Sequence, residues 1–125
     1  MYTPTTHPVT GFKATVRLAF QQAYQGPPLT GPLRCSLVFV LPRPKNMIWK
    51  KRPMPRAWHD KKPDRDNLDK AVMDALKGIA WIDDAQVCDG TIRKYIAAGD
   101  EQPHVEIILE QVDDNEASTI STSKV

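Results

Sequence analysis

Cysteine is scarce in this chain of 125 residues, and long apolar runs are absent. The two cysteines, Cys35 and Cys88, form no Cys-x-x-Cys pair, which excludes a zinc ribbon and a dithiol redox motif. We expect both to be buried thiols. No apolar stretch approaches the roughly 20 residues of a membrane-spanning helix, and the N-terminus lacks the basic and apolar regions of a signal peptide. The sequence therefore predicts a cytoplasmic protein with no membrane partner.

The length allows one compact domain and is too short for two. Apolar residues make up 41% of the chain and charged residues 26%, which is typical of a globular protein rather than a disordered one. We predict that residues 1–112 form this domain. The polar, Ser/Thr-rich residues 113–125 are predicted to form a flexible tail.

Apolar periodicity predicts an α/β (α+β) fold, a small mixed sheet packed by about two helices. Residues 33–41 place an apolar side chain at every second position, and Val38 and Val40 add bulk to the opposite face, which indicates a central strand. The residue before the second helix, Asp66 or Asn67, is the expected cap, and Gly78 is placed to end that helix. The predicted helices are 10–24 and 67–77, and the predicted strands are 33–41, 86–97 and 104–110.

Positive charge is concentrated in the first half of the chain. Residues 1–65 hold 12 Lys or Arg against two Asp, whereas residues 66–125 hold five against 13 Asp or Glu. Nine of the basic residues lie between positions 43 and 65. Such a block is either a solvated face or a phosphate-contacting surface, and phosphate is favoured because metal-type carboxylates follow directly.

Residues 42–63 contain five prolines and no apolar period, so we predict a loop that becomes ordered on binding. Its two large aromatic residues are Trp49 and Trp58. Either they stack on unpaired bases or they pack the loop onto the body of the protein.

Two pairs of aspartates flank the second predicted helix: Asp64 and Asp66 before it, Asp83 and Asp84 after it. The helix advances about 16 Å and the return segment reaches about 20 Å, so Asp84 is able to come back beside the first pair. Oxygen ligands of this kind favour Mg²⁺ or Mn²⁺ over zinc. The alternative is that each aspartate acts locally, Asp66 as a helix cap and the second pair in a turn.

Lys70 follows Asp66 by one helical turn and shares its face. It forms either a surface ion pair with Asp66 or Asp74, worth less than about 1 kcal/mol, or a positive contact to a scissile phosphate.

Several spaced motifs occur together over the 26 residues from position 62 to 87. They resemble the RusA family of Holliday junction resolvases, whose pattern is Asp-x-Asp-Asn-x-x-Lys, a helix with Asp-Ala-Leu, and Asp-Asp before a strand. A weaker likeness extends to Tyr2-Thr3-Pro4, the first helix and the basic loop. The matching residues are Lys62-Pro63-Asp64-Arg65-Asp66-Asn67-Leu68-Asp69-Lys70, Asp74-Ala75-Leu76, Gly78 and Trp81-Ile82-Asp83-Asp84-Ala85-Gln86-Val87.

The resemblance implies a homodimeric, Mg²⁺-dependent endonuclease that nicks four-way DNA junctions symmetrically in recombination and repair, with Mn²⁺ as a plausible substitute. It carries over Asp64, Asp66 and Asp84 as metal-binding and catalytic carboxylates, Asp83 as the less certain member of its pair, and Lys70 as the catalytic lysine. The candidate DNA-binding residues of the basic loop are Lys50, Lys51, Arg52, Arg56, Lys61, Lys62 and Arg65.

One departure from the family concerns the start of the chain. Family members often begin with a strand before the Tyr-Thr-Pro segment, whereas this sequence begins at Met1-Tyr2. A missing strand would leave an edge of the sheet open. Two other function classes stay open: a basic nucleic-acid-binding module without catalysis, in which the aspartates only cap and turn, and a structural or interaction protein.

Overall fold

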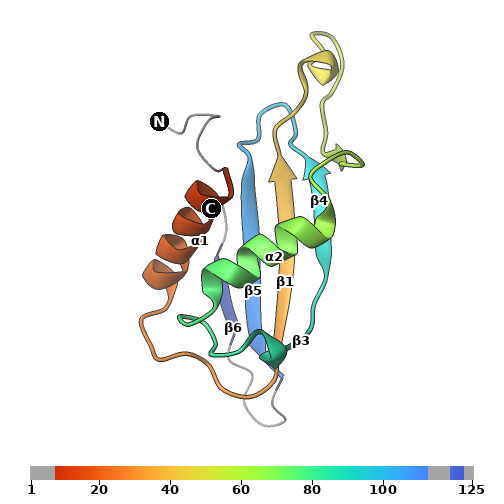
Figure 1. Cartoon of the computed structure of the whole chain (residues 1–125). Coiled ribbons are helices and arrows are strands. Elements are labelled where there is room, and N and C mark those ends of the chain that lie inside the picture. The colour runs from red at the N-terminus through yellow and green to blue at the C-terminus, as the bar shows by residue number, and fades with distance from the viewer. Residues whose placement is uncertain (1–7, 113–118, 123–125) are drawn as a thin grey trace.

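A computed structural model describes residues 8–112 and 119–122 of the chain (Figure 1). Two α-helices and one six-stranded sheet make up the described fold. The elements in chain order are α1 (Pro8–Ala23), β1 (Leu33–Leu41), the 3-10 helix η1 (Lys45–Met47), β2 (Ala57–Trp58), α2 (Arg65–Leu76), the 3-10 helix η2 (Asp84–Gln86), β3 (Val87–Asp89), β4 (Ile92–Ile96), β5 (His104–Gln111) and β6 (Thr119–Thr122).

The centre of the sheet is β1, which has neighbours along both of its edges. It pairs parallel with β3 and β4 on one side and antiparallel with β5 on the other. The strand order is β2-β4-β1-β5-β6, with β3 beside β1. The predictions of a small mixed sheet and of a central strand at residues 33–41 are therefore confirmed.

Both helices pack on the same face of this sheet, where α2 crosses in front of β1 and β5 (Figure 1). Alternate residues of β1 point toward them because side chains of a strand alternate between its two faces. These residues meet their β5 partners in the pairs Cys35 with Leu109, Leu37 with Ile107 and Phe39 with Val105. The helices add Val16, Phe20, Val72, Ala75 and Leu76 to the same core cluster, in which Trp81 is fully buried.

The second helix begins two residues earlier than predicted, at Arg65, and its N-cap is Asp64 rather than Asp66 or Asn67. Asp64 has an extended backbone that suits the residue before a helix, and its carbonyl accepts a hydrogen bond from the Leu68 N–H. Gly78 follows the C-cap with a positive φ of 90° and so ends the helix as predicted.

The single strand predicted at residues 86–97 is instead divided into η2, β3 and β4. The break falls at Gly90, which has a φ of 143°. A Cβ at this position would lie 1.8 Å from the Cys35 carbonyl oxygen, so only glycine fits against β1 here. This close approach lets β1 pair with two successive short strands.

The basic loop is more structured than predicted, because its residues include η1 and β2. β2 adds to the edge of the sheet antiparallel to β4. The Arg43 side chain also donates to the carbonyl oxygens of Met47, Pro55 and Ala97, and these bonds tie the loop to itself and to the end of β4.

Two further predictions are corrected by the structure. Residues 119–122, assigned to a flexible tail, form β6 and pair antiparallel with β5. Cys88 is exposed because it lies on the short strand β3, whereas Cys35 is buried as predicted. The remaining tail residues and the Tyr2-Thr3-Pro4 segment lie outside the described residues, and the domain boundary at residue 112 stays a prediction. Within the described ranges, no helix has the length and apolar character to cross a membrane.

Candidate active site

The first aspartate pair lies at the exposed start of α2. Asp64 makes no side-chain capping hydrogen bond, and its half-exposed carboxylate lies 3.1 Å from the Lys62 ammonium. Asp66 is also exposed, and its Oδ1 accepts a hydrogen bond of 3.0 Å from the Asn67 N–H. Asp66 is therefore not the cap of the helix, and both carboxylates keep oxygens that are open to a ligand.

Asp84 is held by a buried aromatic residue. The indole Nε1–H of Trp81 donates to Asp84 Oδ1 at 2.8 Å, and Trp81 has no exposed surface. A buried indole is fixed by the packing around it, so this bond fixes the orientation of the carboxylate. Only Oδ1 takes part in that bond.

Asp83 has a local role of the kind that the turn interpretation predicts. It is the N-cap of η2, and its Oδ1 accepts from the Ala85 N–H at 3.0 Å. The Gln86 side chain completes a capping box by accepting from the Asp83 N–H, and it also donates to the carbonyl oxygens of Leu29 and Gly31. These bonds anchor the turn to the chain that leads into β1.

A fifth carboxylate, Asp69, joins this region without having been predicted as a site residue. Burial raises the pKa of Asp69, the positive charge of Arg65 opposes this effect, and the negative charge of Asp84 raises the pKa further. Burial, with a smaller contribution from the negative charge of Asp69, raises the pKa of the Cys35 thiol to about 12. The signal in the sequence is the spacing of three residues from Asp66, which is close to one helical turn.

The four aspartates predicted from the sequence do not form a metal-binding cluster in the structure. In the part of the chain that the structure describes, no three His, Cys, Asp or Glu side chains are grouped closely enough to hold a metal ion. On α2, the carboxylate whose pKa is raised by the negative charge of Asp84 is Asp69, in the second turn of the helix. Nevertheless, all of the donors are carboxylate oxygens, which is the donor type that Mg²⁺ and Mn²⁺ prefer.

Lys70 is exposed on α2 and makes no ion pair with any described residue. The alternative interpretation, an ion pair of Lys70 with Asp66 or Asp74, is not observed, and the Asp74 carboxylate instead lies 3.1 Å from the Lys13 ammonium of α1. The ammonium group of Lys70 is thus free to contact a phosphate.

The seven candidate DNA-binding residues fall into two groups. Arg56 is engaged, because its guanidinium donates three hydrogen bonds to the Glu101 carboxylate. This bonding lowers the pKa of Glu101 to about 2. The other six are exposed, as Arg56 is, but none of them is bonded in this way to a described residue. Among the described residues, Lys62 pairs only with the exposed Asp64, and Arg52 lies over the Trp49 ring at 3.9 Å from its centroid. Those six are Lys50, Lys51, Arg52, Lys61, Lys62 and Arg65.

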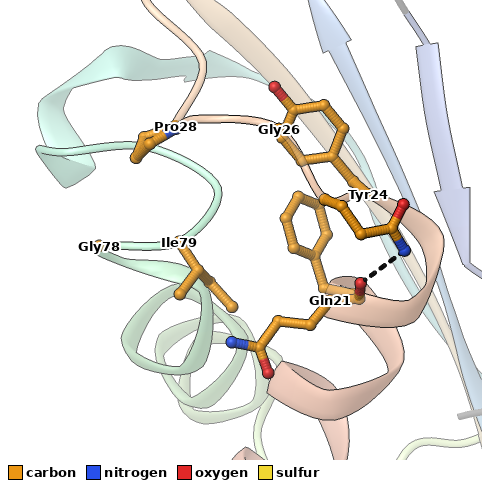
Figure 2. A pocket seen from close by; sticks show the side chains of 8 residues that line it. Gln21, Tyr24, Gly26, Pro28, Gly78 and Ile79 are labelled. Carbon is orange, nitrogen blue, oxygen red and sulfur yellow. Dashed lines mark hydrogen bonds between the residues drawn. The ribbon is translucent and has the colours of Figure 1, made fainter.

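A separate open pocket of about 380 Å³ lies between the C-terminal end of α1 and the turn after α2 (Figure 2). Gln21, Tyr24, Pro28 and Ile79 are among the residues that line it, and the Gln25 amide donates to the Gln21 carbonyl oxygen at its rim. Its lining contains no carboxylate and no basic side chain, so it is distinct from the candidate active site.

The fold and the site thus combine a mixed sheet, exposed carboxylates at a helix start, a carboxylate held by a buried indole and an adjacent basic loop. Carboxylates beside basic side chains are compatible with hydrolysis of phosphodiester bonds in DNA. The family model described as Endodeoxyribonuclease RusA matches residues 1–110. The chain belongs to the RusA family of Holliday junction resolving endonucleases.

A relative in Bacillus subtilis (strain 168), the uncharacterized protein YqaN, is 32% identical over 106 residues. The match covers 81% of this chain and 72% of that protein. No solved structure matches the chain.

Proposed function

We propose that this endonuclease resolves four-way DNA junctions by paired symmetric nicks, as a Mg²⁺-dependent homodimer acting in recombination and repair. The observation that carries the proposal is the arrangement around α2. Exposed carboxylates and Lys70 lie at the start of the helix, the charge of Asp84 raises the pKa of Asp69 on the same helix, and the basic loop leads into the helix start.

In this proposal Asp64, Asp66 and Asp84 hold the metal ion, while Asp83 keeps the η2 turn in place. A bound Mg²⁺ supplies activation of the attacking water and positive charge for the leaving 3′ oxygen, and Mn²⁺ is a plausible substitute. Trp81 orients Asp84 through its hydrogen bond. Lys70 places positive charge near the nonbridging phosphate oxygens as negative charge develops on them.

The remaining contacts are to the DNA backbone. Six exposed basic residues of the loop and the start of α2 would neutralise phosphates, and each neutralised phosphate releases counterions. Because Arg56 is bonded to Glu101, we assign it to the support of the sheet edge rather than to direct phosphate contact. A two-fold dimer would present two sites to a junction of matching symmetry, which accounts for paired nicks.

The decisive experiment compares linear, forked and four-way DNA with the protein in Mg²⁺, in Mn²⁺ and in EDTA. We expect metal-dependent cleavage that favours the four-way junction and is abolished in Asp66→Asn, while binding is retained. Asp60→Asn is the matched control, since it removes an exposed carboxylate of the basic loop outside the site. Metal-independent binding without any cleavage by the unmodified protein would contradict the proposal and favour a binding module.

A further inference from the structure

The two tryptophans of the basic loop have different environments. Trp49 is half-buried, and the guanidinium groups of Arg43 and Arg52 lie 4.7 and 3.9 Å from its ring centroid. Trp58 is 67% exposed, the highest value among the exposed large apolar side chains of the described residues. Trp49 thus packs within the loop, whereas Trp58 presents its ring to solvent.

The exposed ring of Trp58 does not stand alone, because it stacks on Tyr95. The two ring centroids are 4.7 Å apart with an interplanar angle of 24°. The two residues are direct cross-strand partners in the pairing of β2 with β4. The guanidinium of Arg56, itself fixed by Glu101, lies 5.3 Å from the Tyr95 ring centroid. A stack supported in this way is ordered before any ligand arrives, which lowers the entropic cost of binding.

The surroundings of the Trp58–Tyr95 stack are basic. Arg93 precedes Tyr95 by two residues, so it lies on the same face of β4, and it is exposed. Lys61 is exposed three residues after Trp58, and its carbonyl oxygen accepts from the Lys94 ammonium, which holds this segment against the sheet. Aromatic surface framed by cations suits a nucleobase attached to a phosphate backbone.

The stack lies within reach of the candidate active site. β2 is at the edge of the sheet and precedes α2 in the chain (Figure 1). Six peptide steps separate Trp58 from Asp64, so their Cα atoms are at most about 20 Å apart. This is about the width of a DNA duplex. The stack lies on the sheet face away from α2, because Tyr95 is paired with Val40, the neighbour of the helix-facing Phe39. A DNA strand that contacts both places would therefore pass around the edge of the sheet at β2.

We propose that the Trp58–Tyr95 stack is a binding platform for a nucleobase that is unpaired or unstacked in branched DNA. The ring of Trp58 receives the base on its open face, while Tyr95 and Arg56 support it from below. The platform gives a physical source for preference between branched and linear DNA, because a base inside a continuous duplex offers no free face. It rests on the proposed function in that the ligand is DNA, but it does not require catalysis.

The test measures binding in EDTA, by fluorescence anisotropy, to a synthetic four-way junction and to a linear duplex of the same length. Loss of one stacked base predicts that Trp58→Ala weakens junction binding by about 5-fold to 100-fold, while duplex binding changes less than about 2-fold. Trp58→Phe, which keeps a ring, should recover much of the affinity. Ile48→Ala is the matched control because it removes another exposed apolar side chain of the same loop, and it should have no effect.

A second measurement identifies the ligand as a base. A 2-aminopurine placed at the branch point should be quenched by the unmodified protein and less so by Trp58→Ala. Equal junction binding by the unmodified protein and Trp58→Ala would overturn the proposal, as would an equal loss for junction and duplex. Dissociation of a dimer by Trp58→Ala in sedimentation would also overturn it, since the ring would then contact a second chain. Junction binding that depends on Trp58 without any cleavage would refute the proposed function and leave the platform standing.

Discussion

The aspartates before α2 and those after it are held in different ways. Asp64 and Asp66 lie at an exposed helix start, where Asp64 has the exposed Lys62 as its side-chain partner among the described residues. Asp83 and Asp84 lie in a turn in which hydrogen bonds from Ala85 and Trp81 fix both carboxylates. Of the three proposed metal ligands, Asp84 is therefore already held in place, whereas Asp64 and Asp66 are free to adjust when a cation and DNA arrive.

The hydrogen bonds thus indicate different roles for the two adjacent residues of the second pair, a structural role for Asp83 and the proposed metal binding for Asp84. The oxygens of Asp83 serve the fold, since they cap η2, whereas Asp84 accepts one bond from a side chain that is buried beneath it. Substitutions on either side of α2 test whether the two pairs have these different roles.

The largest effect is expected from Asp84→Asn. An amide keeps the oxygen that accepts the Trp81 N–H but removes the negative charge, so metal-dependent junction cleavage should fall more than about 100-fold, beyond the loss typical of a residue that only supports a metal ligand. Single-turnover cleavage rates measure this. Asp83→Asn is the control and should retain most of the activity. If the two substitutions reduced cleavage equally, the assignment of separate roles would be wrong.

A smaller loss of about 10-fold is expected from Trp81→Phe, which keeps a buried ring but removes the N–H that orients Asp84. The loss should be greatest at low Mg²⁺ and recover as Mg²⁺ rises, so the readout is the Mg²⁺ concentration for half-maximal cleavage. Thermal unfolding of the same sample separates this effect from a packing defect. An unchanged Mg²⁺ dependence would mean that Asp84 needs no orienting bond.

The turn itself can be weakened without touching the charge of Asp84. Asp83→Ala removes the cap of η2 and should lower the free energy of unfolding by about 1 kcal/mol, as loss of a capping side chain usually does. Urea denaturation measures the change. Asp64→Ala provides the comparison, because Asp64 makes no side-chain capping bond and its loss should cost less than about 0.5 kcal/mol.

The smallest effect on stability is expected from Lys62→Ala, since the ion pair with Asp64 is exposed and worth little. Its effect should instead be on DNA, where losing one phosphate contact lowers the salt slope of junction binding by about one. Anisotropy titrations between 50 and 200 mM salt check this with the substituted and unmodified proteins. An unchanged slope would place the Lys62 side chain away from the DNA.

Elements with a strong apolar period could be predicted from the sequence. Residues 33–41 alternate without interruption, and the structure places β1 at these residues. The helix containing Val72, Ala75 and Leu76 was also predicted, but its start was placed two residues late because Asp64, Asp66 and Asn67 are all good capping residues.

The failures arise where a distant contact decides the local structure. The strand break at Gly90 depends on the Cys35 carbonyl 55 residues away, and β6 forms in a largely polar segment because β5 offers an edge to pair with. Likewise, the chain spacing shows that Asp84 is able to return to α2. The effect of Asp84 on the pKa of Asp69 and the hydrogen bond from Trp81 depend on how the return segment packs, which the spacing does not determine.

The pairing of β1 also has a consequence for folding kinetics. Its antiparallel partner, β5, joins residues that are far apart in sequence, from the pair Val40 with His104 to the pair Leu33 with Gln111. The central strand therefore lacks one whole edge until nearly all of the described domain has been synthesised. Pairings over such long separations are formed slowly because the intervening chain must be ordered first. During synthesis, β1 therefore cannot complete its sheet pairing and bury its apolar face until residues 104–111 have left the ribosome.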